Sequence, residues 1–66
     1  MNEKEVLYLV LKRQIERNIN NLDALETLEH KIDVFYAADK ITEERYNNLI
    51  ATITTAKGKT AGIEDN

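Results

Sequence analysis

Apolar residues recur at helical spacing in three stretches of the chain, with polar stretches between them. The first stretch predicts a helix over about residues 3–19. Its first two turns are apolar nearly all the way round, so this helix needs more than one neighbour to cover it. Its apolar residues are Val6, Leu7, Leu9, Val10, Leu11, Ile15 and Ile19.

The other two stretches carry narrower apolar stripes, typical of helices that face a single core. One predicts a helix over about residues 23–38, with Val34 pointing away from the stripe, and the next a helix over about residues 43–55. Because the chain has no proline, a continuous helix from Asn21 to Ala56 is the alternative. The stripe residues are Leu25, Leu28, Ile32, Phe35, Tyr36, Tyr46, Leu49, Ile50 and Ile53.

Capping residues stand at the start of each predicted helix. Asn2, with Glu5 three residues later, resembles a capping box. Asn20 or Asn21 can cap the second helix, and Thr42 the third, because their side chains accept hydrogen bonds from free backbone N–H groups. A break near residues 39–40 therefore separates the second helix from the third.

The fold class that follows is all-α, a hairpin or bundle of two or three helices over residues 1–56. Residues 57–66 hold both glycines and one large apolar residue, and we expect a flexible tail there. A 66-residue chain without cysteine, and with one histidine, has neither disulfides nor a four-ligand zinc site to reinforce it. We therefore expect oligomerisation to complete the core, which is predicted to consist of Leu11, Ile15, Leu25, Leu28, Ile32, Phe35, Tyr46, Leu49 and Ile53.

Candidate interaction residues differ in character along the chain. The wide apolar arc of the first helix offers a surface for self-association, for which the candidates are Val6, Tyr8, Leu9 and Val10. The net charge of −3 argues against binding nucleic acid by overall charge, although a local basic patch is present. That patch consists of Lys12, Arg13 and Arg17, and the second helix offers an acidic face for a protein partner at Glu26, Glu29 and Asp33.

Catalytic constellations are missing from the sequence. There is no serine or cysteine, the threonines have no partner histidine, and His30 falls on the polar side of its helix. Glu43 and Glu44 are explained by the dipole at a helix start rather than by metal binding. We expect a protein that is not an enzyme and that uses no cofactor and no metal.

The longest apolar run, residues 6–11, is too short to cross a membrane, and no secretory signal is recognisable. These features favour a cytoplasmic protein without a membrane partner.

A helix ending in the aromatic pair Phe35-Tyr36 is followed by a Lys-Ile-Thr turn at residues 40–42 and by a helix that opens with acidic residues and Tyr46. In this pattern residues 31–50 resemble the short XkdX-like proteins of Gram-positive phages and prophages. Asp39 stands where that family commonly has glycine. The resemblance implies an origin among phage structural genes, a role in assembly and a virion-associated location as the alternative to a cytoplasmic one, and it brings no catalytic residue.

The sequence thus predicts a small non-enzymatic, phage- or prophage-encoded protein that mediates assembly or protein–protein interaction, most simply as a homo-oligomer or with a phage structural protein. Two alternatives stay open. One is a helical dimer that regulates by binding RNA or DNA, and the other is an inhibitor or adaptor of a host protein.

Overall fold

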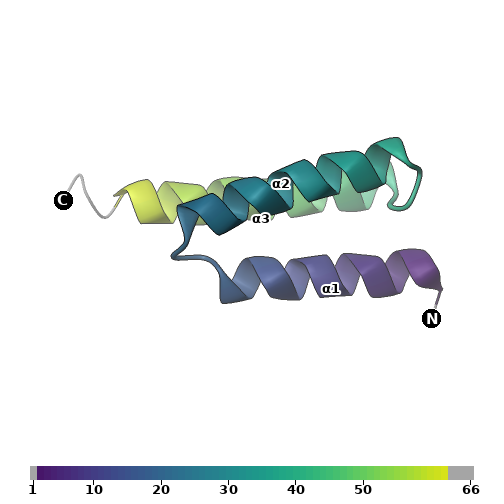
Figure 1. Cartoon of the computed structure of the whole chain (residues 1–66), viewed down its shortest axis with the longest axis horizontal. Helices are drawn as coiled ribbons and strands as arrows, with labels where there is room; N and C mark the ends of the chain where they lie inside the picture. Colours follow the sequence, from purple (N-terminus) through teal and green to yellow (C-terminus); the bar gives the residue numbers. More distant parts are fainter. Residues whose placement is uncertain (1, 63–66) are drawn as a thin grey trace.

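The computed structural model describes residues 2–62, with side chains to residue 59, and contains three helices. They are α1 (Glu3–Arg17), α2 (Leu22–Ala37) and α3 (Glu43–Gly62). The chain runs along α1, back along α2 and forward again along α3, so α1 and α3 are parallel (Figure 1). The all-α prediction is confirmed, and no strand occurs in the described part of the chain.

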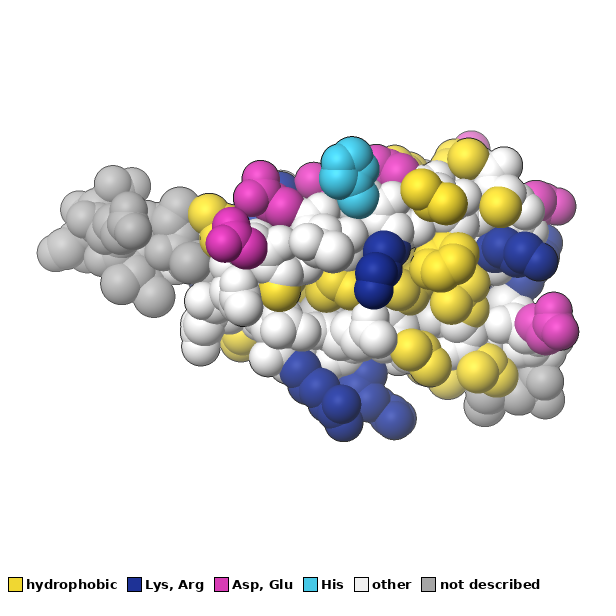
Figure 2. All heavy atoms as spheres, in the orientation of Figure 1, with side chains coloured by type: hydrophobic (Ala, Val, Ile, Leu, Met, Phe, Trp, Pro, Cys, Tyr) yellow, Lys and Arg dark blue, Asp and Glu magenta, His cyan; other side chains and the backbone are white. Residues whose placement is uncertain are grey.

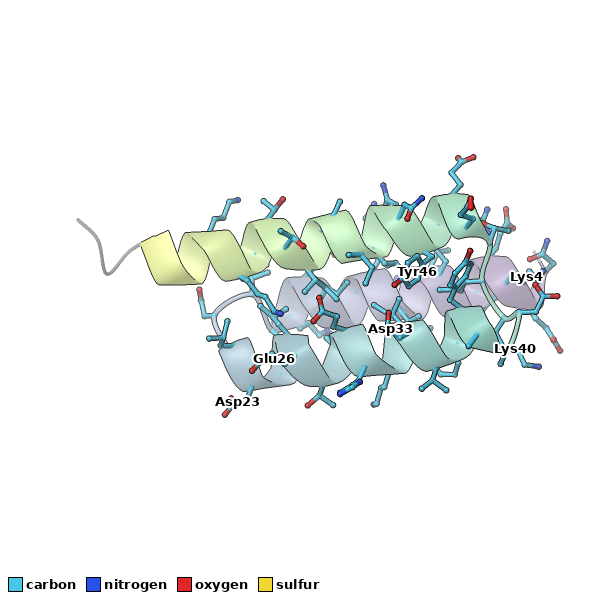
Figure 3. All side chains as sticks on the ribbon, turned by 90° about the horizontal axis from the view of Figure 1, so that it is seen from above. Lys4, Asp23, Glu26, Asp33, Lys40 and Tyr46 are labelled. Carbon is cyan, nitrogen blue, oxygen red and sulfur yellow. The ribbon has the colours of Figure 1, made fainter. Side chains whose placement is uncertain are left out.

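Each helix packs against both of the others, so the bundle encloses one core. Figures 1 and 3, which differ by a quarter turn, show the three axes at the corners of a triangle. Seven of the nine predicted core residues are buried, whereas Phe35 and Tyr46 are half-buried against them. The buried residues are Leu11, Ile15, Leu25, Leu28, Ile32, Ile41, Leu49, Ile53 and Ala56.

The side chains predicted to cap the helices do so. Asn2 Oδ1 accepts a hydrogen bond from the Glu5 N–H at 2.8 Å, and Asn21 Oδ1 accepts one from the Ala24 N–H at 3.1 Å. Thr42 Oγ1 accepts from the Arg45 N–H at 3.2 Å. These bonds satisfy N–H groups that have no partner within their own helix.

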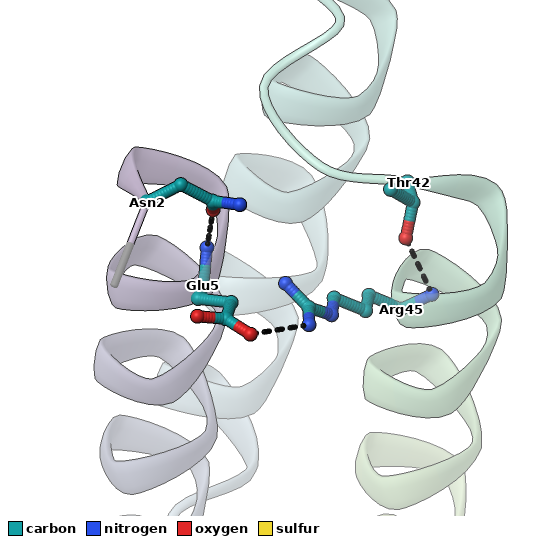
Figure 4. A network of polar contacts seen from close by, with 4 residues as sticks. All are labelled: Asn2, Glu5, Thr42 and Arg45. Atoms are coloured by element: carbon teal, nitrogen blue, oxygen red, sulfur yellow. Dashed lines mark hydrogen bonds and ion pairs between the residues drawn. The ribbon is translucent and has the colours of Figure 1, made fainter.

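The side chains of Glu5 and Arg45 pair with each other instead of returning to their own helix starts. Each is the third residue of its helix, and because α1 and α3 are parallel, the two starts lie side by side (Figure 4). Arg45 Nη2 lies 3.3 Å from Glu5 Oε1, with both side chains partly buried. The contact joins two helix starts that are 40 residues apart in sequence.

A left-handed residue, Asp39, ends α2 and excludes the continuous helix considered above. Its φ is 61°, and it is the one non-glycine residue with positive φ among those described. The Asp39 N–H donates to the Tyr36 carbonyl at 3.0 Å and the Lys40 N–H to the Phe35 carbonyl at 2.8 Å. This is the Schellman pattern, which satisfies the last carbonyls of a helix.

Ile41 follows this turn and is buried, with 1% of its surface exposed. It belongs to the central core together with residues of all three helices. The short connection between α2 and α3 therefore contributes one of the core side chains.

The third helix is longer than the sequence predicted. It was expected to end near Thr55, but it continues to Gly62, so residues 57–62 are helical rather than part of a tail. Ala56 is buried in the core and Lys57 Nζ lies 3.1 Å from Glu29 Oε1 on α2. These contacts offset the cost of about 1 kcal/mol that Gly58 imposes inside a helix. The last part of the expected tail, residues 63–66, lies outside the described residues.

Two substitutions of Asp39 distinguish the backbone conformation of the turn from the side chain's ion pair as contributions to stability. Lys4 Nζ lies 3.8 Å from Asp39 Oδ1, which is a weak ion pair. Asp39→Ala is expected to lower the free energy of unfolding by about 1 kcal/mol, because alanine tolerates positive φ poorly. Asp39→Gly loses the same ion pair and is expected to stay within about 0.5 kcal/mol of the natural chain. Urea unfolding followed by circular dichroism measures both, and equal losses would contradict the left-handed turn.

Truncation of Ile41 tests its place in the core. Ile41→Ala is expected to cost about 2–4 kcal/mol of unfolding free energy and Ile41→Val about 1 kcal/mol, because each leaves unfilled space. Thr54→Ser, which removes a methyl group from an exposed residue of α3, serves as the control and is expected to change stability by less than about 0.5 kcal/mol. If Ile41→Val were as mild as this control, the connection would not be part of the core.

Candidate interaction surface

Polar contacts between α1 and α3 gather around Tyr8. Its hydroxyl donates to Asn48 Oδ1 at 2.8 Å, and the Arg45 guanidinium carbon lies 5.3 Å from the centre of its ring. Lys12 Nζ lies 5.8 Å from the same ring centre. The sequence placed Tyr8 on the surface left free by the bundle, but the side chain is half-buried and packs against the core. It is therefore committed to contacts within the chain.

A second polar seam joins α2 to α3. The rings of Tyr36 and Tyr46 stack with centroids 4.3 Å apart and planes inclined by 19°. The Tyr46 hydroxyl donates to Asp33 Oδ1 at 2.7 Å, and Figure 3 shows these two side chains turned toward each other. The hydrogen bond to the Asp33 carboxylate raises the pKa of Tyr46 above its ordinary value, and partial desolvation and nearby negative charge act in the same direction.

The side of α1 turned away from the bundle remains open. We call it the outer face of α1, and it consists of Val6, Leu9, Val10, Arg13 and Arg17, all exposed. On a helical wheel these residues lie opposite the buried Leu11 and Ile15. The three apolar residues are 46%, 43% and 45% exposed, respectively, and occupy the first half of the helix. The two arginines occupy the second half.

The three basic candidates do not form one patch. Lys12 turns toward the Tyr8 ring, within the α1–α3 seam. Arg13 and Arg17 lie on the outer face of α1, and neither forms an ion pair with another described residue. The basic surface is therefore a pair of arginines one turn apart, next to apolar side chains.

The three acidic candidates also differ in their surroundings. Glu29 pairs with Lys57, and Asp33 accepts the hydrogen bond from Tyr46, so both are engaged within the chain. Glu26 is exposed and lies with Asp23 and His30 along the free side of α2. Figure 3 shows Asp23 projecting away from the bundle at the start of that helix.

The described residues offer neither a cluster of metal ligands nor a membrane-spanning helix. Among residues 2–62, no three His, Cys, Asp or Glu side chains come together in a way that could hold a metal ion. A hollow between Ile19 and α3 is lined mainly by small side chains, among them Ala51, Thr52 and Thr55. None of the helices in the described range is both long and apolar enough to cross a bilayer.

Comparisons with known proteins give no match to a family model, to a curated protein or to a solved structure. The surfaces of this chain therefore supply the observations that bear on its function.

The hydrogen bond from Tyr46 to Asp33 predicts a stability that declines in alkali. Because the folded pKa of Tyr46 is raised above that of the unfolded chain, near 10, its contribution is complete below that value. It is lost as the pH rises through the folded pKa. Nuclear magnetic resonance titration of the tyrosine rings should show Tyr46 titrating above its ordinary value, and Asp33→Asn should lower that pKa. An unchanged pKa in Asp33→Asn would mean that the carboxylate is not the cause.

Proposed function

We propose that this chain is a small non-enzymatic assembly protein that associates with further copies of itself through the outer face of α1. One observation carries the proposal: Val6, Leu9 and Val10 form a row on one side of α1 and leave nearly half of their surfaces in water. Single exposed apolar residues are ordinary, whereas a contiguous row bordered by charged residues is typical of an interaction surface.

The small size of the chain also favours association with a partner. A chain of this length buries a smaller share of its surface than a larger domain does, so covering a further apolar row adds directly to its stability. Tyr8 and Glu5, which lie outside this face, both contact α3 within the chain. The apolar side chains of α1 that remain for another molecule are therefore those of its outer face.

The resemblance to XkdX-like phage proteins supports an assembly role of phage origin. In that family glycine commonly stands at the position of Asp39, and Asp39 adopts a positive φ of 61°, the conformation that favours glycine. The turn of this chain therefore has a backbone conformation that glycine at this position could also adopt.

Two leucines of equal exposure provide a matched test. Leu9 lies on the outer face of α1 and Leu22 at the start of α2, and each is 43% exposed. Leu9→Gln is expected to raise the dissociation constant for self-association about tenfold, since covering a half-exposed leucine contributes on the order of 1 kcal/mol. Leu22→Gln is expected to leave it unchanged. Sedimentation equilibrium over a wide range of concentrations measures both variants, with helicity followed on the same samples.

A natural chain that stays monomeric at every concentration would overturn the proposal. Equal weakening of self-association by Leu9→Gln and Leu22→Gln would also count against it. Self-association would then depend on exposed apolar surface in general rather than on the outer face of α1. Retardation of nucleic acid that is lost in Arg13→Ala with Arg17→Ala, in a monomeric protein, would favour the regulatory alternative.

A further inference from the structure

We infer that the outer face of α1 docks on the free side of α2 of a second copy, so that copies associate head to tail. This inference rests on the proposed function and names the surface that receives α1. The free side of α2, which we call the outer face of α2, consists of Asp23, Glu26, His30 and Val34, all exposed. Val34 is 64% exposed, more than any other large apolar residue described.

The two faces are complementary in charge and in order along the helix. On α1 the apolar residues come first and the arginines last, whereas on α2 the carboxylates of Asp23 and Glu26 come first and Val34 comes last. An antiparallel pair of helices therefore places Val34 against the apolar half of α1 and the two carboxylates against the arginines, with His30 between them.

The spacing fits a single register. Eleven positions separate Val6 from Arg17, and eleven separate Asp23 from Val34. With Val6 opposite Val34, Arg17 stands opposite Asp23, and Arg13 comes opposite Glu26 within one position. All of these residues follow the three- and four-residue steps that keep side chains on one side of a helix.

The molecule already holds the two faces in the orientation that this pairing needs. Because α1 and α2 are antiparallel within the chain, their charged halves lie toward the α1–α2 connection and their apolar halves toward the other end. Figure 2 shows Lys and Arg side chains on the free edge of α1, and acidic side chains with the histidine on the free edge of α2. Hydrophobic side chains lie at the same end of both edges. A second copy, placed beside the first in the same orientation, brings the free edge of its α2 against the free edge of α1 of the first copy.

A two-fold contact of α1 with α1 is less favourable on the same grounds. In an antiparallel pair centred on Leu9, Arg13 would stand opposite residue 5 of the partner, where Glu5 already pairs with Arg45 of its own chain, so Arg13 would lose water without gaining a free carboxylate. In a parallel pair, Arg13 and Arg17 would face their own copies. Head-to-tail docking gives both arginines an acidic neighbour and gives Val34 an apolar one.

Charge reversal on each face, followed by mixing, tests the inference. The first variant carries Arg13→Glu and Arg17→Glu, and the second carries Asp23→Lys and Glu26→Lys. Each alone is expected to raise the dissociation constant for self-association at least about tenfold, because two attractive pairs become repulsive. Mixed in equal amounts, they should associate again, because the natural α1 of the second variant meets the natural α2 of the first, and the reversed α1 of the first meets the reversed α2 of the second.

Two further variants control for effects of the substitutions on folding. A chain with all four reversals has the net charge of the natural one and should recover self-association. Val34→Gln changes no charge, lies at an exposed position, and should weaken association about fivefold. Circular dichroism of every variant establishes that the helices are intact.

The possible results separate this inference from the proposed function. If the α1 reversal abolishes self-association while the α2 reversal and Val34→Gln do not, and mixing restores nothing, then α1 pairs with another surface and head-to-tail docking is wrong. The proposed function would survive that result. If the natural chain shows no self-association at all, both are wrong.

Discussion

The reversal of the chain at Asp39 is the constraint on which the rest of the bundle depends. Without proline, and with no glycine before position 58, nothing in the backbone forbids one long helix through residues 21–56. The left-handed residue and the two hydrogen bonds of the Schellman pattern turn the chain, and Ile41 enters the core directly after them. Because α3 thereby returns antiparallel to α2, it runs parallel to α1, and the Glu5–Arg45 contact between helix starts becomes possible.

Local signals in the sequence were sufficient for the helices and most of the core, because caps and helical periodicity depend on neighbouring residues. Asn2, Asn21 and Thr42 all cap as their positions predicted. The end of α3 was predicted wrongly, since its glycine-bearing composition argued for a tail, whereas contacts of Ala56 and Lys57 with the rest of the bundle extend the helix. Tertiary packing outweighed local propensity there.

The candidate interaction surface shows the same contrast between what local sequence determines and what tertiary contacts determine. Periodicity alone indicated that Val6, Leu9 and Val10 would be left over on α1, and they are exposed. It misplaced Tyr8, because Tyr8 lies at the edge of the apolar arc and its surroundings are decided by Asn48 and Arg45, about 40 residues away. Val34, which the periodicity placed off the stripe of its helix, is exposed as predicted.

The stacked pair Tyr36 and Tyr46 also gives the bundle an optical signature. The chain has no tryptophan, so its near-ultraviolet absorption comes chiefly from tyrosine, and two of its three tyrosine rings lie nearly parallel with centroids 4.3 Å apart. Rings this close couple their electronic transitions and respond with a circular dichroism that depends on their mutual angle. That signal reports the packing of α2 on α3, whereas the far-ultraviolet signal reports helices alone. The near-ultraviolet circular dichroism of this protein therefore distinguishes a packed bundle from a loosened, molten one.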